Sequence, residues 1–142
     1  MHTRRLGREG PVVSALGIGA MSFGNFYGPT TDENSFAILD AAREAGVTHI
    51  DTSNVYGDGR SERVIGEWLR ANPAARGQVT IATKAGISRG ADGARRFDNS
   101  PGHLESELDG SLSRLGVEAV DLFYVHRREA ERPIEEVTET LA

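Results

Sequence analysis

Short apolar runs alternate with longer segments of helical spacing along most of the chain. The runs are Ala15–Gly19, Val47–Ile50, Val79–Thr83 and Val120–Val125. Each is followed by a polar segment and then by apolar residues three or four positions apart, the spacing of a helix. This order is typical of repeated βα units around a parallel sheet, whose strands are expected to be covered on both faces.

The polar residues before each apolar periodic segment indicate where the helices begin. The first helix is expected to start near Thr30 or Thr31, where Thr30 and Glu33 have the spacing of a capping box. Ser61 is expected to be the N-cap of the second helix, and Ser100 that of the third.

Two glycines and several apolar side chains complete the predicted helices. Gly46 and Gly116 are suited to the left-handed residue that ends a helix, and a fourth helix is expected after Pro133. Phe36 and Trp68 lie on helix faces and are expected in the core. The third helix has the clearest apolar face, formed by Leu104, Leu108, Leu112 and Leu115.

The segment Arg4–Leu16 differs from the rest, because a polar turn at Arg8-Glu9-Gly10 separates two short extended pieces. We expect a β-hairpin there. The sequence therefore predicts an α/β fold of the (β/α)8 TIM-barrel type, of which about the first four βα units are present after an N-terminal hairpin. All of residues 1–142 are expected to belong to one domain.

Composition narrows the function. The net charge is −5 and the basic residues are interspersed with acidic ones, so nucleic acid is not expected as a partner. No apolar stretch approaches the roughly 18 residues of a membrane span, and no secretory signal is evident. The absence of cysteine excludes disulfides and thiolate metal sites. A cytoplasmic protein without membrane partners is expected.

Candidate chemistry lies where the predicted strands end, because the loops there converge on one face of a parallel barrel. Asp51, Lys84 and His126 follow three successive strands, and Tyr56 lies five residues after Asp51. A single ionisable residue at the end of a strand is usually an ordinary solvated surface residue. Ionisable residues after three successive strands favour a functional site instead. A cation stabilises a phenolate, a carboxylate keeps a desolvated lysine charged, and an imidazole can donate to a carbonyl oxygen.

These positions lie within motifs that resemble a known family. The motifs are Gly46–Gly57 (GVTHIDTSNVYG), Ser61-Glu62, Val64-Ile65-Gly66, Ile81–Lys84 (IATK), Asp121–His126 (DLFYVH) and Pro133–Glu136 (PIEE). In this order they resemble the aldo-keto reductase superfamily from the hairpin onward.

The resemblance implies an NADPH-dependent oxidoreductase that reduces the carbonyl group of a small aldehyde or ketone. It implies that Tyr56 gives a proton to the carbonyl oxygen, that Lys84 and Asp51 tune Tyr56, and that His126 orients the substrate. The choice of NADPH over NADH is carried by the resemblance alone.

The loop after the first strand is implied to contribute to the cofactor site. By the resemblance, Gly19, Ala20 and Met21 lie near the nicotinamide and Asp51 touches its ribose. Tyr27, in the same loop, either lines a substrate pocket or shields the loop.

Two other features of the sequence have more than one interpretation. The polar segment Ser88–Phe97 is either a lid over the barrel mouth or a floppy exposed connection. His49 and His103 suggest metal ligands, but no spacing in the chain supplies three close ligands, and no metal is expected.

The number of units leaves several hypotheses open. A complete barrel of this type has eight units in about 250 residues, whereas this chain has 142 residues. Four units leave two open strand edges and an uncovered apolar interior, which favour self-association. The chain is then a fragment of a longer reductase, half of a barrel completed by a second copy, or an inactive truncated product. A non-catalytic binding or regulatory relative is the alternative function.

Overall fold

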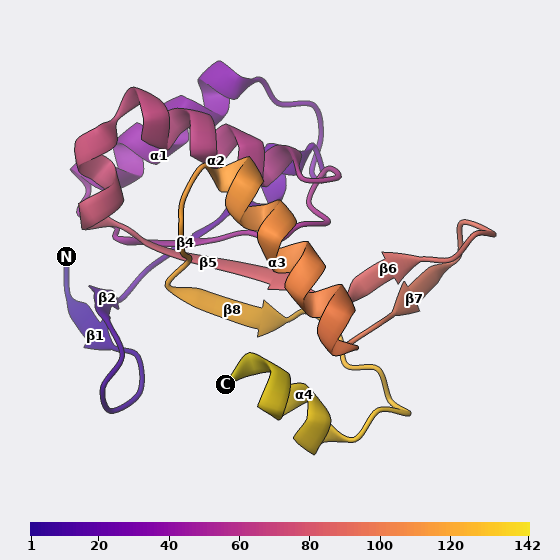
Figure 1. The fold of residues 1–142 in the computed structure, drawn as a ribbon. Coiled ribbons are helices and arrows are strands. Elements are labelled where there is room, and N and C mark those ends of the chain that lie inside the picture. Colours follow the sequence, from indigo (N-terminus) through magenta and orange to yellow (C-terminus); the bar gives the residue numbers. More distant parts are fainter.

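A parallel sheet with helices on its outer face forms the body of the molecule (Figure 1). The computed structural model describes all residues, Met1–Ala142. The central strands lie in the order β3-β4-β5-β8, and each neighbouring pair is parallel. The four βα units are β3 (Ile18–Gly19) with α1 (Asp32–Glu44), β4 (His49–Asp51) with α2 (Arg60–Ala71), β5 (Thr80–Ala85) with α3 (Pro101–Leu115), and β8 (Leu122–Val125) with α4 (Ile134–Leu141).

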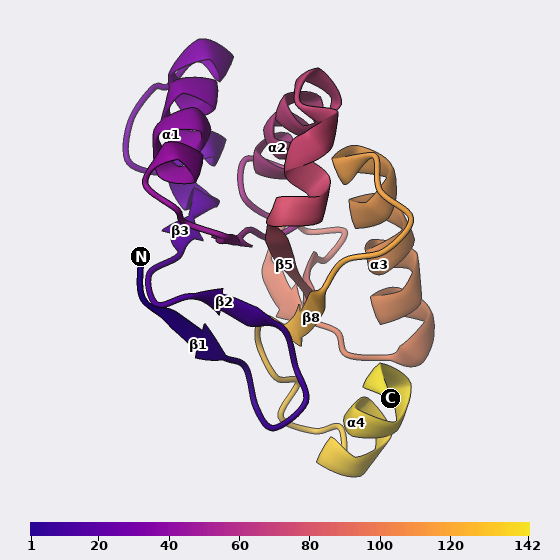
Figure 2. The same ribbon diagram turned by 90° about the vertical axis from the view of Figure 1, so that its left-hand side faces the viewer.

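The helices follow one another in an arc around the strands, as in part of a barrel wall (Figure 2). The predicted N-terminal hairpin is confirmed: β1 (Thr3–Arg5) pairs antiparallel with β2 (Val12–Ser14). Reciprocal bonds attach the hairpin to the start of β4. The Ser14 amide donates to Thr48 Oγ1 at 2.8 Å, and the Thr48 amide donates to Ser14 Oγ at 2.9 Å.

The main core lies between the sheet and the first three helices. Ile65, Trp68 and Ile81 are almost fully buried there, and Phe36 packs against them from the edge, as predicted. The indole N–H of Trp68 donates to Asp40 Oδ1 at 2.9 Å, so its burial leaves no polar atom unpaired. A large apolar side chain buried in this way stabilises the fold by about 1.5–3 kcal/mol.

Two predicted helix ends are confirmed. Gly46, directly after the C-cap residue of α1, has φ +80°, and Gly116, the C-cap of α3, has φ +66°. Glycine adopts this left-handed conformation without the penalty that a Cβ atom brings.

The start of α1 differs from the predicted capping box. The N-cap is Thr31, whose Oγ1 accepts a hydrogen bond from the Asn34 amide at 3.2 Å. Thr30 precedes the cap, so the reciprocal pair predicted for Thr30 and Glu33 is wrong. The two threonines are adjacent and equally suited to the position, and the path of the preceding loop selects between them.

The predicted start of α2 is wrong, whereas that of α3 is confirmed in position. Gly59 is the N-cap of α2, and Ser61 lies in its first turn, where its buried hydroxyl donates to the Ala20 carbonyl at 2.8 Å. Ser100 is the N-cap of α3 by position but makes no side-chain capping bond. Its own amide donates to Asp98 Oδ1 at 2.9 Å. At Ser61, a tertiary contact therefore overrides the local capping preference.

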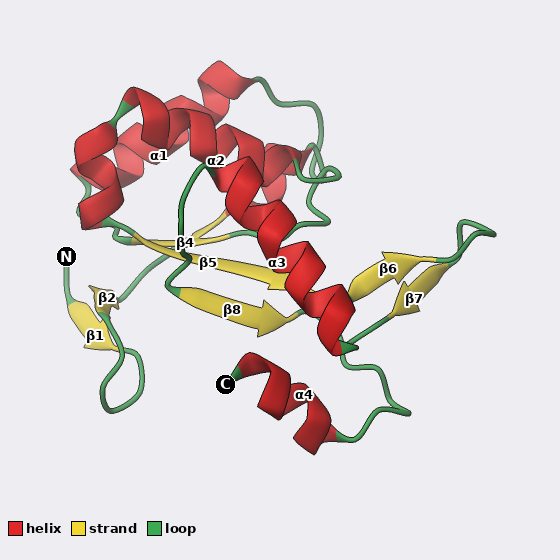
Figure 3. Cartoon of the chain, in the orientation of Figure 1, coloured by secondary structure: helices red, strands yellow, loops and turns green.

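Further elements complete the chain, among them a second hairpin (Figure 3). The segment Ser88–Phe97, expected to be a lid or a floppy connection, is mostly an antiparallel hairpin that projects beyond the carboxyl end of β5. The other elements are the 3₁₀ helices η1 (Ala20–Gly24) and η2 (Pro73–Gln78) and the hairpin strands β6 (Ile87–Arg89) and β7 (Arg95–Phe97).

The expectation that every strand is covered on both faces is not met at β8. Tyr124 is 42% exposed, and Leu122, Phe123 and Val125 are only half-buried. None of the helices combines the length and apolar composition needed to cross a bilayer.

Candidate active site

Adjacent parallel strands bring the candidate residues to one edge of the sheet. Asp51 is the last residue of β4, Lys84 lies one residue before the end of β5, and His126 directly follows β8. The His126 amide donates to the Ala85 carbonyl at 2.7 Å, which continues the strand pairing beyond β8. Tyr56 lies in the loop between β4 and α2. The structure therefore brings together the four residues selected from the sequence.

The ammonium group of Lys84 joins three of these features. Its Nζ donates to Asp51 Oδ1 at 2.5 Å and to the Thr52 carbonyl at 2.8 Å, and it reaches Tyr56 Oη at 3.4 Å. The Lys84 side chain is only 16% exposed, whereas that of Asp51 is 34% exposed. An ammonium group has three protons, and the acceptors here match that number, so the site satisfies a charged lysine.

The loop that carries Tyr56 is held by a close backbone approach to η1. A Cβ atom on Gly24 would lie 2.6 Å from both the Tyr56 carbonyl carbon and the Gly57 nitrogen. The Tyr56 carbonyl also accepts a hydrogen bond from the Ser61 amide at 3.1 Å. These contacts fix the backbone position of Tyr56 relative to the carboxyl ends of the strands.

His126 is held between Ser53 and Tyr56. Its Nδ1 lies 3.0 Å from Ser53 Oγ, and its ring meets the Tyr56 ring edge-on, with centroids 5.7 Å apart. Burial lowers the pKa of His126 below its ordinary value, and the positive charges of Lys84 and two nearby arginines lower it further. The ring is therefore neutral at neutral pH.

The hydroxyl of Ser53 has one proton and three acceptors within reach. They are His126 Nδ1 at 3.0 Å, the Lys84 carbonyl at 3.2 Å and Asn54 Oδ1 at 3.2 Å. A proton given to Nδ1 would leave the imidazole proton on Nε2, and a proton given elsewhere would reverse the tautomer. Ser53 thus controls which ring nitrogen of His126 can donate.

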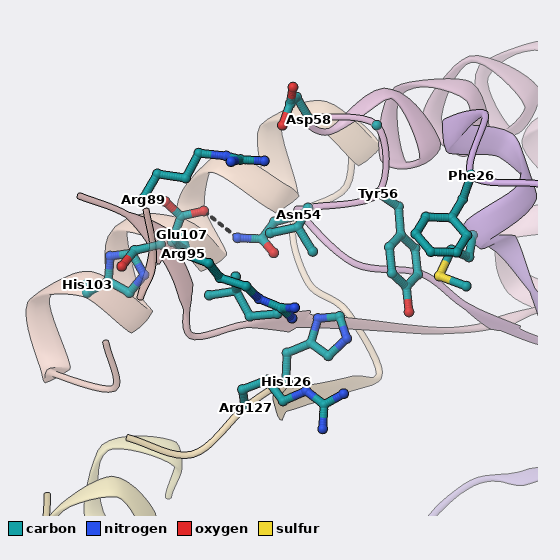
Figure 4. A pocket seen from close by; sticks show the side chains of 15 residues that line it. Phe26, Asn54, Tyr56, Asp58, Arg89, Arg95, His103, Glu107, His126 and Arg127 are labelled. Carbon is teal, nitrogen blue, oxygen red and sulfur yellow. Dashed lines mark hydrogen bonds between the residues drawn. The ribbon is translucent and has the colours of Figure 1, made fainter. Parts of the chain in front are cut away.

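A cavity of about 910 Å³ opens beside these residues (Figure 4). Tyr56 and His126 line it, whereas Asp51 and Lys84 do not, so the phenol and the imidazole are the two of these four groups that face this cavity. The other lining residues are Met21, Phe26, Asn54, Val55, Gly57, Asp58, Ile87, Ser88, Arg89, Arg95, His103, Glu107 and Arg127.

The residues of the loop after β3 lie beside the site but differ in how exposed they are. Gly19 is paired in register with Asp51, is exposed, and has no atom within 4 Å of an added Cβ. Met21 lines the cavity. Ala20 is fully buried, and only its carbonyl is engaged, by Ser61. Of the three residues of this loop that were predicted, with Asp51, for the cofactor, Gly19 and Met21 therefore have free surface, and Ala20 does not.

The remaining sequence candidates separate into two groups. Tyr27 is 73% exposed and does not line the cavity, whereas its neighbour Phe26, which it meets edge-on at 5.2 Å, does. His103 lines the cavity, and His49 does not. Neither histidine belongs to a group of three side chains that could hold a metal ion.

Sequence reasoning missed several residues that shape the site. Ser53 and Asn54 lie between Asp51 and Tyr56, and Arg127 follows His126, so their only sequence signal is a place in a strand-end loop. Arg95 and Phe26 had no specific signal, because their positions depend on a hairpin and a turn that the sequence pattern does not define.

Family and sequence comparisons agree with this geometry. The model of the aldo/keto reductase family matches residues 15–142. The chain is 38% identical over 136 residues to the aldo-keto reductase yakc of Schizosaccharomyces pombe, which is named for NADP(+). It is 38% identical over 141 residues to the aldo-keto reductase str7 of Strobilurus tenacellus. Each match covers 95% of this chain, but the chain spans only 39% of either relative's length.

Solved structures with the same fold are also similar. The holo form of aldo-keto reductase AKR11C1 from Bacillus halodurans has a TM-score of 0.84 and 30% identity, and the match covers 99% of this chain and 45% of that one. The glycerol dehydrogenase AKR11B4 from Gluconobacter oxydans has a TM-score of 0.82 and 29% identity over 98% and 43% of the two chains. These neighbours are (β/α)8 barrels, so the four βα units correspond to the first part of such a barrel.

Proposed function

Because the chain belongs to the aldo/keto reductase family, we propose that its strand-end site reduces aldehyde or ketone carbonyls to alcohols with NADPH. The observation that carries the proposal is the ammonium of Lys84, which lies between the Asp51 carboxylate and the Tyr56 hydroxyl. The name of the yeast relative, which includes NADP(+), supports the choice of cofactor.

Tyr56 is the proton donor in this proposal. It is the hydroxyl that both lines the cavity and contacts Lys84. As the carbonyl carbon is reduced, its oxygen gains negative charge and takes the phenol proton. The phenolate left behind is stabilised by the ammonium 3.4 Å away, and Asp51 holds that ammonium in place.

His126 positions the carbonyl oxygen. Its ring is neutral, so it can donate only from the nitrogen that carries the proton. If Ser53 donates to Nδ1, its shortest contact, the proton lies on Nε2 and can be directed to the substrate. Tyr56 and His126 then present two donors to one oxygen, which favours the developing alkoxide over the neutral carbonyl.

The residues at the ends of β3 and β4 fit a nicotinamide and its ribose. Gly19 has open space where a Cβ would stand, the Asp51 carboxylate is one-third exposed, and Met21 offers an apolar surface. Asp51 would accept a bond from a ribose hydroxyl. When bound, the cofactor supplies the hydride, while these residues set its distance from the carbonyl carbon.

The test uses the purified 142-residue chain. NADPH oxidation is followed by absorbance with a panel of aldehydes and ketones, for the unchanged protein and for Tyr56→Phe. Loss of a general acid reduces turnover by about 10²–10⁴-fold, so Tyr56→Phe should fall by that factor. Tyr27→Phe is the matched control, because Tyr27 is exposed and lies outside the cavity.

Three outcomes separate the functional hypotheses. Turnover that Tyr56→Phe abolishes and Tyr27→Phe preserves supports the reductase. NADPH binding, measured by cofactor fluorescence, without turnover favours the non-catalytic relative. Full turnover in Tyr56→Phe contradicts the assignment of the proton donor.

A further inference from the structure

The lining of the cavity divides into two ends (Figure 4). Phe26 and Tyr56 lie toward one end, and Arg89 lies toward the other. Resting on the proposed carbonyl reduction, we propose that the substrate carries a second, anionic group, a carboxylate or a phosphate, which is bound by Arg95 and Arg127, the two arginines drawn beside His126.

The charge of the cavity is opposite to that of the chain. Arg89, Arg95 and Arg127 line it, against two carboxylates, Asp58 and Glu107, so three positive charges face two negative ones. The whole chain has a net charge of −5. The positive residues are therefore concentrated here against the general trend of the sequence.

No carboxylate of the protein forms an ion pair with these arginines. None of the three arginines belongs to an ion pair. The carboxylate of Glu107 keeps its negative charge but is oriented by Asn54, whose Nδ2 donates to Glu107 Oε2 at 2.6 Å. A guanidinium group has five N–H donors in a planar fork that matches carboxylate and phosphate oxygens.

The second hairpin places two of the arginines directly opposite each other. Arg89 on β6 pairs in register with Arg95 on β7. Like charges at such a position destabilise a strand pair, and an anion placed between them would remove that cost. The Arg95 guanidinium lies over the ring of Phe97, with Cζ 5.6 Å from the ring centroid.

Arg127 is fixed by its backbone. Asn99, which is fully buried, donates from Nδ2 to the Arg127 carbonyl at 3.1 Å and accepts from the Glu129 amide at 2.7 Å. These two hydrogen bonds join the loop after β8 to the segment before α3. The backbone of Arg127 is therefore held in a defined place directly after His126, and its side chain lines the cavity.

The positive charges of these arginines act on His126, which lies where the carbonyl is expected to react. The charges of Arg127 and Arg95 both contribute to the lowered pKa of His126, after burial and Lys84. An anion bound to them would offset part of this field and raise the His126 pKa. Met21 and Ile87 line the same cavity, so the substrate class is a carbonyl compound with an apolar spacer and an anionic tail.

The test compares substrates that differ only in charge. The ratio of kcat/KM for 4-formylbenzoate to that for its methyl ester is measured in the unchanged chain, Arg95→Gln and Arg127→Gln. We expect the unchanged chain to favour the carboxylate and each variant to reduce the ratio about fivefold, as for a solvent-screened ion pair. Arg96→Gln and Arg128→Gln are adjacent controls outside the cavity, and their ratio should not change.

A binding measurement keeps the two proposals separable. Benzene-1,4-dicarboxylate and the corresponding diamide are titrated while the His126 ring is followed by NMR. If nothing is turned over, yet the dicarboxylate alone raises the His126 pKa and Arg95→Gln abolishes the rise, the anion site holds and the reductase proposal fails.

Two results would overturn the anion site. The first is an unchanged ratio of carboxylate to ester in both arginine variants. The second is a rise in the KM for NADPH in those variants with the ratio intact, because the arginines would then bind the phosphate groups of the cofactor.

Discussion

Glu62 and Arg114 form an ion pair that joins α2, α3 and β5. The Glu62 side chain is fully buried, and its Oε2 accepts from Arg114 Nε at 2.6 Å while its Oε1 accepts from Thr83 Oγ1 at 2.5 Å. Arg114 is 26% exposed. The two partners are therefore unequal, because water can reach the arginine but not the carboxylate.

This asymmetry predicts different costs for removing each partner. Arg114→Met leaves a buried carboxylate with only the Thr83 hydroxyl, and breaking a buried pair in this way costs about 3–5 kcal/mol of unfolding free energy. Glu62→Gln keeps the size but has one acceptor oxygen in place of two: the oxygen can still accept from Arg114 Nε, and the amide N–H₂ then faces Thr83 Oγ1 and can donate to that hydroxyl. Its cost is that of weaker hydrogen bonds, about 1–2 kcal/mol. The double variant Glu62→Leu with Arg114→Met should regain more than half of the Arg114→Met loss, because no charge is left buried.

Urea unfolding followed by tryptophan fluorescence measures these differences. Trp68 is the only tryptophan and is buried on α2, two turns from Glu62. Arg63→Met is the control, since Arg63 is exposed on the same helix, and its cost should be within about 0.5 kcal/mol. A loss below about 1 kcal/mol in Arg114→Met, or a larger loss in Glu62→Gln, would refute the reasoning.

Three further predictions concern the site. NMR titration should give His126 a pKa below 6.5, and Lys84→Met should raise it without restoring 6.5, because burial is the larger cause and remains; a fall would contradict this. Gly24→Ala should reduce carbonyl turnover more than stability, since its Cβ would displace the Tyr56 loop. Asn99→Ala should speed amide hydrogen exchange in the loop after β8, because the loop loses its two hydrogen bonds to the Asn99 side chain. Unchanged amide protection would show that these two bonds do not hold the loop.

The arrangement of strands was predictable because it depends on a repeated local pattern. Each short apolar run became a strand of one parallel sheet, and parallel pairing brings strand ends to the same edge whatever the loops do. Asp51, Lys84 and His126 therefore met as expected. The left-handed glycines Gly46 and Gly116 were predictable for the same reason, since the requirement for positive φ is local.

Features that depend on contacts between distant residues were not predictable. Ser61 has the residue type of an N-cap, but its hydroxyl bonds to Ala20, 41 positions away. The second hairpin was missed because the antiparallel strands β6 and β7 are three residues long and consist mostly of polar side chains. Strands of that length carry too few alternating positions to distinguish them from a loop.

Net charge alone does not determine which small ligand the cavity accepts. A chain with charge −5 would be expected to repel anions, and this holds for encounters far from the surface. At about 0.15 M salt, however, charges separated by more than roughly 8 Å are largely screened. A ligand inside the cavity therefore responds to the side chains that line it, of which Arg89, Arg95 and Arg127 outnumber Asp58 and Glu107. Because strand ends set where the reaction occurs and loops set what is bound, a positive loop lining can select an anionic substrate in an acidic protein.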